Sequence, residues 1–155
     1  MKLITRSAVM TAAGTGLKII AADELPVQRF DKYTQETYSE ILLMSGIEWR
    51  GGKRQLVMVD CGNRSSIDHV LGSVRRLRVE NGQLIGDAYF ADDRRSQEIK
   101  RKVMDGHVDQ FEVTAAPVES KRIQAGRAAT VHGRKIAGPA VVVTRWKPID
   151  ISLWV

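Results

Sequence analysis

The Asn81-Gly82 dipeptide constrains the fold of this chain more than any other local feature. It separates two strand-like segments, Leu71 to Val79 and Gln83 to Phe90, which are rich in apolar and β-branched residues. Asparagine and glycine both accept the positive φ angles of a type I′ turn, and that turn suits the twist of paired antiparallel strands. The sequence therefore predicts a β-hairpin over 71–90.

Short apolar segments bounded by polar residues predict further strands on both sides of this hairpin. These segments are Leu17 to Ala22, Leu56 to Val59, Val108 to Val118, Ala140 to Trp146 and Ile149 to Val155. Pro148 predicts a bend between the last two segments. Residues 119–137 are basic and contain glycine, which predicts a long hairpin loop.

One helix is predicted over 94–105. Asp92 or Asp93 is a candidate N-cap, and Gly106 is a candidate stop. Residues 31–48 are ambiguous, because their apolar spacing fits a helix while their threonine residues disfavour one. Many short strands with one or two helices indicate an α+β, β-rich fold, namely a small closed β-barrel flanked by one to three helices.

The length of 155 residues indicates one domain. Residues 1–16 are small and polar and predict a flexible leader, so the single domain is expected over 17–155. Arg6 interrupts the only stretch that resembles a signal peptide. The chain stops within the apolar run Ile151 to Val155, which favours a fragment of a longer protein. No run approaches the roughly 20 apolar residues of a membrane span, so no membrane association is expected.

The formal net charge of +6 raises the possibility of a nucleic-acid-binding module. That hypothesis requires the basic clusters, represented by Arg75, Arg94, Lys100 and Lys121, to converge on one face. The alternative is that each cluster forms a solvated face of its own element. No aromatic residues alternate with these clusters, as they do in proteins that stack single-stranded bases, so we favour the solvated faces.

Three segments, taken in order, resemble the prohead proteases of tailed phages. The first is Leu56-Val57-Met58-Val59-Asp60-Cys61-Gly62-Asn63-Arg64-Ser65-Ser66 with Val70-Leu71-Gly72, the second is Val103-Met104-Asp105-Gly106 with Gln110-Phe111-Glu112-Val113, and the third is Trp146-Lys147-Pro148-Ile149-Asp150-Ile151-Ser152-Leu153. The resemblance extends over residues 18–155. It implies a small β-barrel with flanking helices, as in the herpesvirus assembly proteases, and a place inside the procapsid in the host bacterial cytoplasm.

The resemblance also implies that the catalytic residues are lost. In register, Gly62 stands where the family has its histidine, and a shift of one residue would place Cys61 there instead. Glu112 stands where the family has its nucleophilic serine, and only the closing acid is retained in kind, as Asp150. A serine hydroxyl needs a base to remove its proton, so we expect no serine-protease activity.

Other residues are candidates for a relocated catalytic pair. His69 and His107 are candidate bases near Ser65, Ser66 and Ser73. Polar loop residues of this kind are more often solvated or capping, Cys61 is more often a buried inert thiol, and His132 is expected to be exposed. Three scattered histidines and one cysteine give no spacing typical of a metal site, and no cofactor motif is present.

The resemblance thus implies a catalytically inactive domain that serves as an assembly or scaffolding module in procapsid formation. Its expected partners are the phage major capsid protein or scaffold protein, together with further copies of itself. The two alternatives are an active head maturation protease with non-standard residues and a basic nucleic-acid-binding module.

Overall fold

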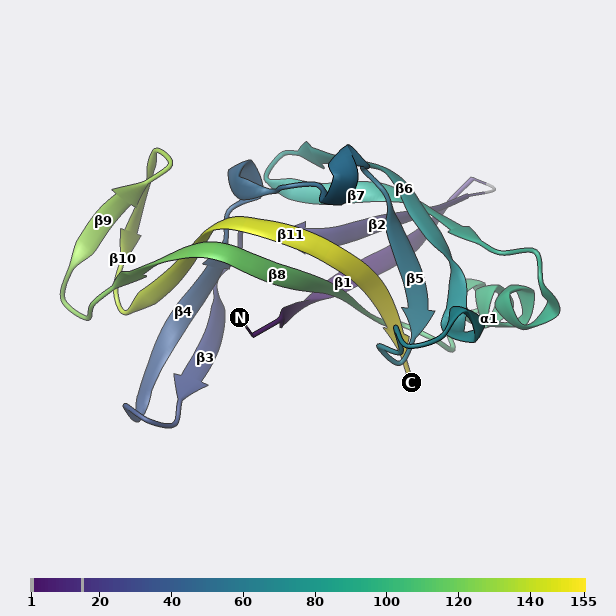
Figure 1. Cartoon of the computed structure of the whole chain (residues 1–155), viewed down its shortest axis with the longest axis horizontal. Coiled ribbons are helices and arrows are strands. Elements are labelled where there is room, and N and C mark those ends of the chain that lie inside the picture. Colours follow the sequence, from purple (N-terminus) through teal and green to yellow (C-terminus); the bar gives the residue numbers. More distant parts are fainter. Residues whose placement is uncertain (1, 15) are drawn as a thin grey trace.

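The structure is a computed structural model that describes residues 2–14 and 16–155. Seven strands form a closed barrel (Figure 1), in the order β11-β5-β6-β7-β2-β1-β8, with β8 pairing back onto β11. Their bounds are β1 Ile4–Ala13, β2 Gly16–Asp23, β5 Leu56–Asp60, β6 Val70–Glu80, β7 Gln83–Phe90, β8 Gln110–Ile123 and β11 Ala140–Trp154. The expectation of a small, β-rich closed barrel is confirmed at this level.

The hairpin predicted from Asn81-Gly82 is present as β6 and β7. Asn81 has a φ of 51° and Gly82 a φ of 73°, which are the two positive values that a type I′ turn requires. Glu80 pairs with Gln83 directly across this turn. The local signal therefore fixed the register beside the turn, and a shift between Arg75 and Arg78 changes it further along the hairpin.

Alternation along the strands places the core inside the barrel. On β8 and β11, Val113 and Ile151 pair with each other and are fully buried in the same core as Met58 of β5. The residues between them point to the outer face of the barrel wall, because successive side chains of a strand alternate between faces. This alternation decides which side of the wall carries the candidate site.

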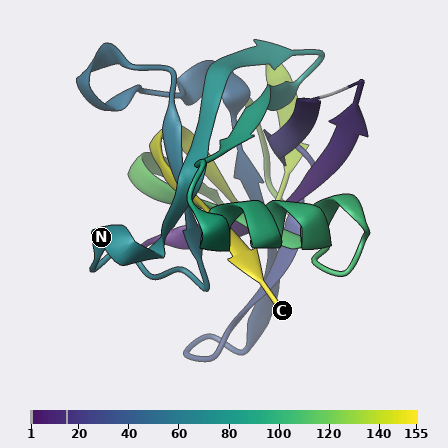
Figure 2. The same ribbon diagram turned by 90° about the vertical axis from the view of Figure 1, so that its right-hand side faces the viewer.

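Helix α1 (Arg94–Met104) lies across one end of the barrel (Figure 2). Asp93 is its N-cap, and its Oδ1 accepts a hydrogen bond of 2.9 Å from the Ser96 amide. The helix ends before Gly106, whose φ is 79°. Val103 is buried in the barrel core, so the helix closes this end, which we call the α1 end.

At the opposite end, β8 and β11 continue beyond the barrel and support two further hairpins, and we call this part the distal lobe (Figure 1). Its strands are β3 Val27–Asp31, β4 Glu36–Leu42, β9 Ala128–Val131 and β10 Arg134–Ala137. Strand β4 runs parallel to β11, and β3 forms the outer edge of the sheet. A second, smaller core joins the lobe, with Ile41, Val142 and Ile136 among its buried members.

The barrel and the distal lobe meet at Trp146 and Gly46. Trp146 is fully buried, and its Nε1 donates a hydrogen bond of 2.9 Å to the Leu43 carbonyl oxygen. A Cβ at Gly46 would overlap the Thr144 carbonyl oxygen, so the two backbones pack closely. The junction is therefore rigid and sensitive to side-chain size.

Some sequence-based predictions were wrong, and one ambiguous segment was decided. Residues 4–13 form barrel strand β1 rather than a flexible leader, whereas Met1 and Thr15, in the same expected leader, lie outside the described residues. In the ambiguous segment 31–48, residues 36–42 form strand β4. The predicted loop over 119–137 contains the end of β8 and the hairpin β9–β10, and β11 passes through Pro148 as one strand with shifts in register.

Within the described residues, no helix combines the length and apolarity needed to cross a membrane.

Candidate functional site

The two acids taken from the family resemblance lie on adjacent strands of the barrel wall. Asp150 of β11 pairs with Thr114 of β8, and Ser152 pairs with Glu112. These four residues share the outer face, because they alternate with core residues on the same strands. We call this set the β8–β11 patch.

The third family-equivalent position, Gly62, lies against the same patch. Residues 60–63 form a tight turn, in which the Asn63 amide donates to the Asp60 carbonyl oxygen at 2.8 Å and Gly62 has a φ of 67°. A Cβ at Gly62 would lie 3.1 Å from the Trp154 ring and 3.7 Å from Ser152 Oγ. The fold therefore brings Gly62, Glu112 and Asp150 to one place, although they are far apart in the sequence.

Arg64, just after that turn, forms an ion pair with Asp150 through its Nε and Oδ2 of the carboxylate. Asp150 is fully buried, while the Arg64 side chain remains 40% exposed. Burial raises the pKa of Asp150, and the nearby Thr114 hydroxyl, the Arg64 guanidinium and the Ser152 hydroxyl oppose that rise. The two hydroxyls lie outside regular hydrogen-bond geometry with the carboxylate, which leaves Arg64 as its principal charged contact.

The β8–β11 patch lacks the histidine and serine pair that the resemblance would require. Gly62 has no side chain, and Glu112 offers a carboxylate where a hydroxyl would be needed. The nearby serines make local contacts. Ser65 Oγ donates to Asn63 Oδ1 at 2.6 Å, Ser66 caps a short 3₁₀ turn, and Ser73 accepts from Arg75 Nε at 3.0 Å.

The fallback residues His69, Cys61 and His107 do not form a catalytic pair. His69 Nδ1 lies 2.9 Å from Asp60 Oδ1, and Arg95 also pairs with Asp60. The Cys61 thiol is exposed, which corrects the expectation of a buried thiol, and His107 is exposed in the turn after α1. Among residues 2–14 and 16–155, neither His69 nor His107 has a hydroxyl or thiol hydrogen-bonded to its ring.

Sequence reasoning missed one contact between a hydroxyl and an imidazole. Ser45 Oγ lies 2.8 Å from His132 Nδ1, across 87 positions of the chain. Both residues are exposed, so the pair stands at the surface where the β9–β10 turn meets the junction. No local pattern could have shown it, because it depends on how the distal lobe folds back.

The basic clusters do not converge on one face. Arg94 and Lys100 lie on α1, and Arg75 lies on β6 with its guanidinium 5.0 Å from the Tyr89 ring centre. Lys121 pairs with Val142 in the distal lobe, at the other end of the molecule (Figure 1). The common basic face that the nucleic-acid hypothesis required from these four residues is therefore absent.

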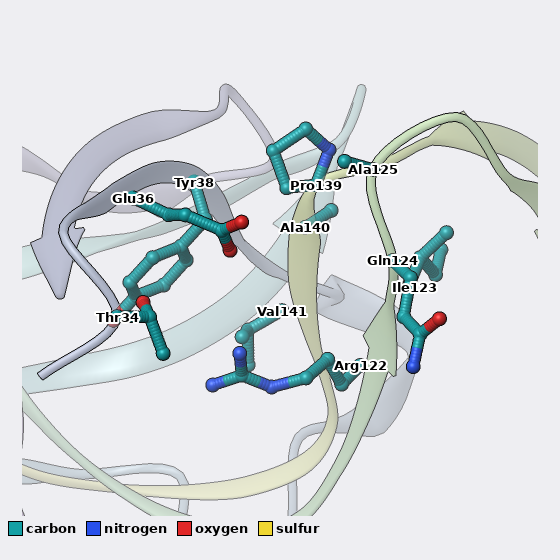
Figure 3. Close-up of a pocket in the computed structure, with 10 residues that line it drawn as sticks. All are labelled: Thr34, Glu36, Tyr38, Arg122, Ile123, Gln124, Ala125, Pro139, Ala140 and Val141. Carbon is teal, nitrogen blue, oxygen red and sulfur yellow. The ribbon is translucent and has the colours of Figure 1, made fainter.

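The distal lobe carries an open groove of about 340 Å³ between β4 and β8. In Figure 3, Thr34, Glu36 and Tyr38 line one side, Arg122 and Gln124 line the other, and β11 passes between them. The Arg122 guanidinium lies 6.0 Å from the Tyr38 ring centre. An aromatic ring, a cation and an anion thus face one concave surface, which is a combination suited to polar peptide segments.

Among the described residues, no three His, Cys, Asp or Glu side chains are grouped to hold a metal ion. Comparison with known proteins gave no match to any family model, curated protein or solved structure.

Proposed function

We propose that this chain is a catalytically inactive, protein-binding module for the assembly of a phage procapsid. The observation that carries the proposal is the convergence of Gly62, Glu112 and Asp150 on the β8–β11 patch. Three segments selected by resemblance to prohead proteases meet there, and the family positions hold neither the histidine nor the serine of a serine protease. The family's catalytic residues are replaced in this chain while the barrel is kept. Binding is then the function that selection can preserve.

The groove between β4 and β8 is the surface that we assign to the partner. It is concave, open and lined by Tyr38, Arg122 and Glu36. Tyrosine and arginine are the residue types that most often dominate the free energy of protein binding. An extended segment of the major capsid protein or of a scaffold protein is the partner that the resemblance favours.

The binding experiment uses the full chain and the purified major capsid protein of the same genome. We expect the substitutions Tyr38→Ala and Arg122→Ala to weaken binding about tenfold or more each. Arg94→Ala is the matched control, because Arg94 is 92% exposed on α1 at the opposite end. Equal affinity of all variants, or no binding by the native chain, would contradict the assigned groove or the assembly role respectively.

The absence of catalysis is tested by rebuilding the family residues. The native chain should not cleave capsid or scaffold protein, while Gly62→His combined with Glu112→Ser should restore measurable cleavage. The positive φ of Gly62 and the nearby Trp154 ring make the histidine strained, so Trp154→Ala belongs in a third variant. Cleavage by the native chain would overturn the proposal.

The contact between Ser45 and His132 favours a second candidate function, a protease with a relocated catalytic pair. If the native chain cleaves protein, Ser45→Ala should abolish that activity while the fold remains intact. Cleavage that survives this substitution would exclude the Ser45 hydroxyl as the nucleophile.

A further inference from the structure

Strand β3 has a neighbour on only one side. It pairs with β4, and no other backbone group of residues 2–14 and 16–155 bonds to residues 27–30. Every strand of the closed barrel, by contrast, has a partner on both sides. An unpaired edge of this kind presents free amides and carbonyls to another strand.

The pairing of β4 shows which backbone groups of β3 are free. The Ser39 amide donates to the Pro139 carbonyl oxygen at 3.1 Å, so Ser39 directs its backbone groups toward β11. Alternate residues of a strand direct these groups to opposite sides. Tyr38 and Glu40 therefore direct theirs toward β3.

The partners of Tyr38 and Glu40 are Arg29 and Val27. Those two residues consequently use their backbone groups on β4. Gln28 and Phe30, which lie between and beyond them, direct their N–H and C=O groups outward. Phe30 is thus a free backbone position near the end of an exposed edge strand.

Large apolar side chains cluster around this edge without cover. Leu25 is 67% exposed, Phe30 is 61% exposed and Tyr33 is 87% exposed. They lie just before β3, within it, and in the turn after it. Exposed apolar residues grouped on one edge indicate an interaction surface more than isolated ones do.

The sequence Arg29-Phe30-Asp31 is complementary to itself when two copies run antiparallel about Phe30. Phe30 then faces Phe30 of the second copy, and each Arg29 faces an Asp31. Existing contacts already hold both charged side chains, since Arg29 Nη2 donates to the Thr5 carbonyl oxygen at 3.0 Å, Arg29 Nε pairs with Glu40 Oε1 at 3.3 Å, and Asp31 Oδ1 accepts from the Tyr33 amide at 2.9 Å. We propose that β3 is a self-association edge, through which two copies of this chain form a two-fold antiparallel pair centred on Phe30.

The hydrogen-bond pattern fits this register. Phe30 points its backbone groups outward, so the two copies exchange two hydrogen bonds at the centre, as a hydrogen-bonded antiparallel pair does. Arg29 and Asp31 then fall at the non-hydrogen-bonded positions, where opposed side chains come closest. Opposite charges at such positions are favourable, while a register shifted by two would oppose like charges.

The same register covers Phe30, because the two copies of this side chain face each other at the centre of the contact. A cavity of about 410 Å³ adjoins the start of β3, and Leu25, Pro26 and Val27 form part of its wall. Tyr33 lies in the turn after β3, beyond the residues that pair in this register.

The other open edges are less suited to this role. Strands β9 and β10 have four residues each, and β10 carries Arg134 and Lys135. Short edges with basic side chains resist pairing with further strands. The β3 edge lacks this protection at Phe30.

The inference deepens the proposed function by naming a partner, and it rests on that function only for its biological setting. A contact of one short strand and a few side chains is below the roughly 1,200 Å² of a stable complex. The pair is therefore weak in dilute solution and becomes populated when many copies are concentrated in one shell.

The first experiment measures self-association of the full chain by sedimentation velocity over a wide concentration range. Phe30→Pro removes an outward amide without breaking a bond to β4, so it should abolish dimer formation while the chain stays folded. Phe30→Lys is the second variant should the proline variant not fold, since an edge lysine blocks pairing without altering the backbone. Ile67→Ser is the control, because Ile67 is 87% exposed on the turn before β6 and should leave the dimer unchanged.

The second experiment tests the register by cross-linking in a Cys61→Ser background, which removes the only native thiol. In the proposed register, the Cα atoms at position 30 are about 5.5 Å apart, within the range for a disulfide. Phe30→Cys should therefore give a covalent dimer on mild oxidation. Gln28→Cys should not, because position 28 faces position 32 of the second copy.

The outcomes separate this inference from the proposed function. A dimer that is lost in Phe30→Pro and trapped by Phe30→Cys supports the inference even if the capsid protein does not bind. A strict monomer at all concentrations overturns it, even if the capsid protein binds at the groove. Trapping at position 28 in preference to position 30 also overturns the two-fold register.

Discussion

The two ends of the molecule differ in what they leave open to a partner. At the α1 end, a helix covers the barrel and the charged residues are held in pairs, with Arg64 on Asp150 and both His69 and Arg95 on Asp60. In the distal lobe, the Tyr38–Arg122 groove and the β3 edge remain open. At the α1 end, the charged side chains named above already have partners within the chain. In the distal lobe, the groove and the unpaired strand edge leave side chains and backbone groups available to a ligand.

This contrast separates the positions selected by the resemblance from the surfaces to which we assign binding. The resemblance directs attention to the β8–β11 patch, where Asp150 is buried and has Arg64 as its charged contact. The proposed groove and edge belong to the distal lobe, although the cavity beside Leu25 extends to Glu112 of the patch. Four substitutions test the junction between the two ends and the contacts at the α1 end.

The largest effect is expected at the junction that joins the two ends. Trp146→Ala should lower the free energy of unfolding by about 3–5 kcal/mol, because it empties a buried site and leaves the Leu43 carbonyl oxygen without its donor. Chemical denaturation monitored by circular dichroism measures this change. The control is Trp154→Ala, which removes a ring that is 36% exposed and should cost less than about 1 kcal/mol. Equal losses of unfolding free energy in the two variants would show that Trp146 contributes no more to stability than the partly exposed Trp154 does.

An intermediate effect is expected at the α1 end. Arg64→Ala should lower stability at neutral pH by about 1–3 kcal/mol, because it leaves the buried Asp150 carboxylate without its principal charged contact. The loss should shrink at low pH, where Asp150 is protonated. Adding Asp150→Asn should recover most of it, and a loss independent of pH would contradict this assignment.

The pKa of Asp150 also gives the native chain a signed pH dependence. Its folded value is raised above the ordinary 3.8, so the folded state holds the proton more tightly than the unfolded state. The stability that this proton contributes is complete below 3.8 and is lost as pH rises through the raised folded value. Asp150→Asn should remove this component from the stability profile.

The smallest effect is expected at the helix cap. The Ser96 amide lowers the pKa of Asp93, so the stabilisation by this cap is present above the ordinary value and is lost as pH falls through the lowered one. Asp93→Ala should speed hydrogen exchange in the first turn of α1 and lower the Tm by a few degrees at most. Asp92→Ala is the control, because Asp92 is the exposed neighbour of Asp93, and this substitution should leave hydrogen exchange in the first turn unchanged. Exchange that is unaltered in both variants would mean that packing alone holds the helix.

Local signals predicted the parts of the fold that depend on a few adjacent residues. The Asn81-Gly82 turn and the Asp93 cap both follow from backbone preferences, and both were located correctly. Strand β1 was missed because the charged residue Arg6 makes the segment look polar. The Arg6 side chain is buried and pairs with Glu40 Oε1 at 2.6 Å, and this partner lies 34 positions away, outside any local window.

The candidate site was predictable only in part for the same reason. Resemblance identified Gly62, Glu112 and Asp150, and strand register explains why they meet. The ion pair of Arg64 with Asp150 was not anticipated, because two residues 86 positions apart have no pattern in common. The β4 strand was ambiguous because Tyr38, Ile41 and Leu42 also satisfy helical spacing, and pairing with β11 decided between the two.

Strand β11 has a consequence for how the molecule is made. It pairs with β4 and β5 on one side and with β8 on the other, yet it follows all three of these strands in the chain. Until β11 has been synthesised, β8 has only β1 beside it, and the barrel remains an open, aggregation-prone sheet. Closure of the barrel therefore depends on contacts distant in the chain, and such steps are slow. A chain interrupted before β11 would leave a sheet edge unpaired, and copies in that state would be prone to associate through it.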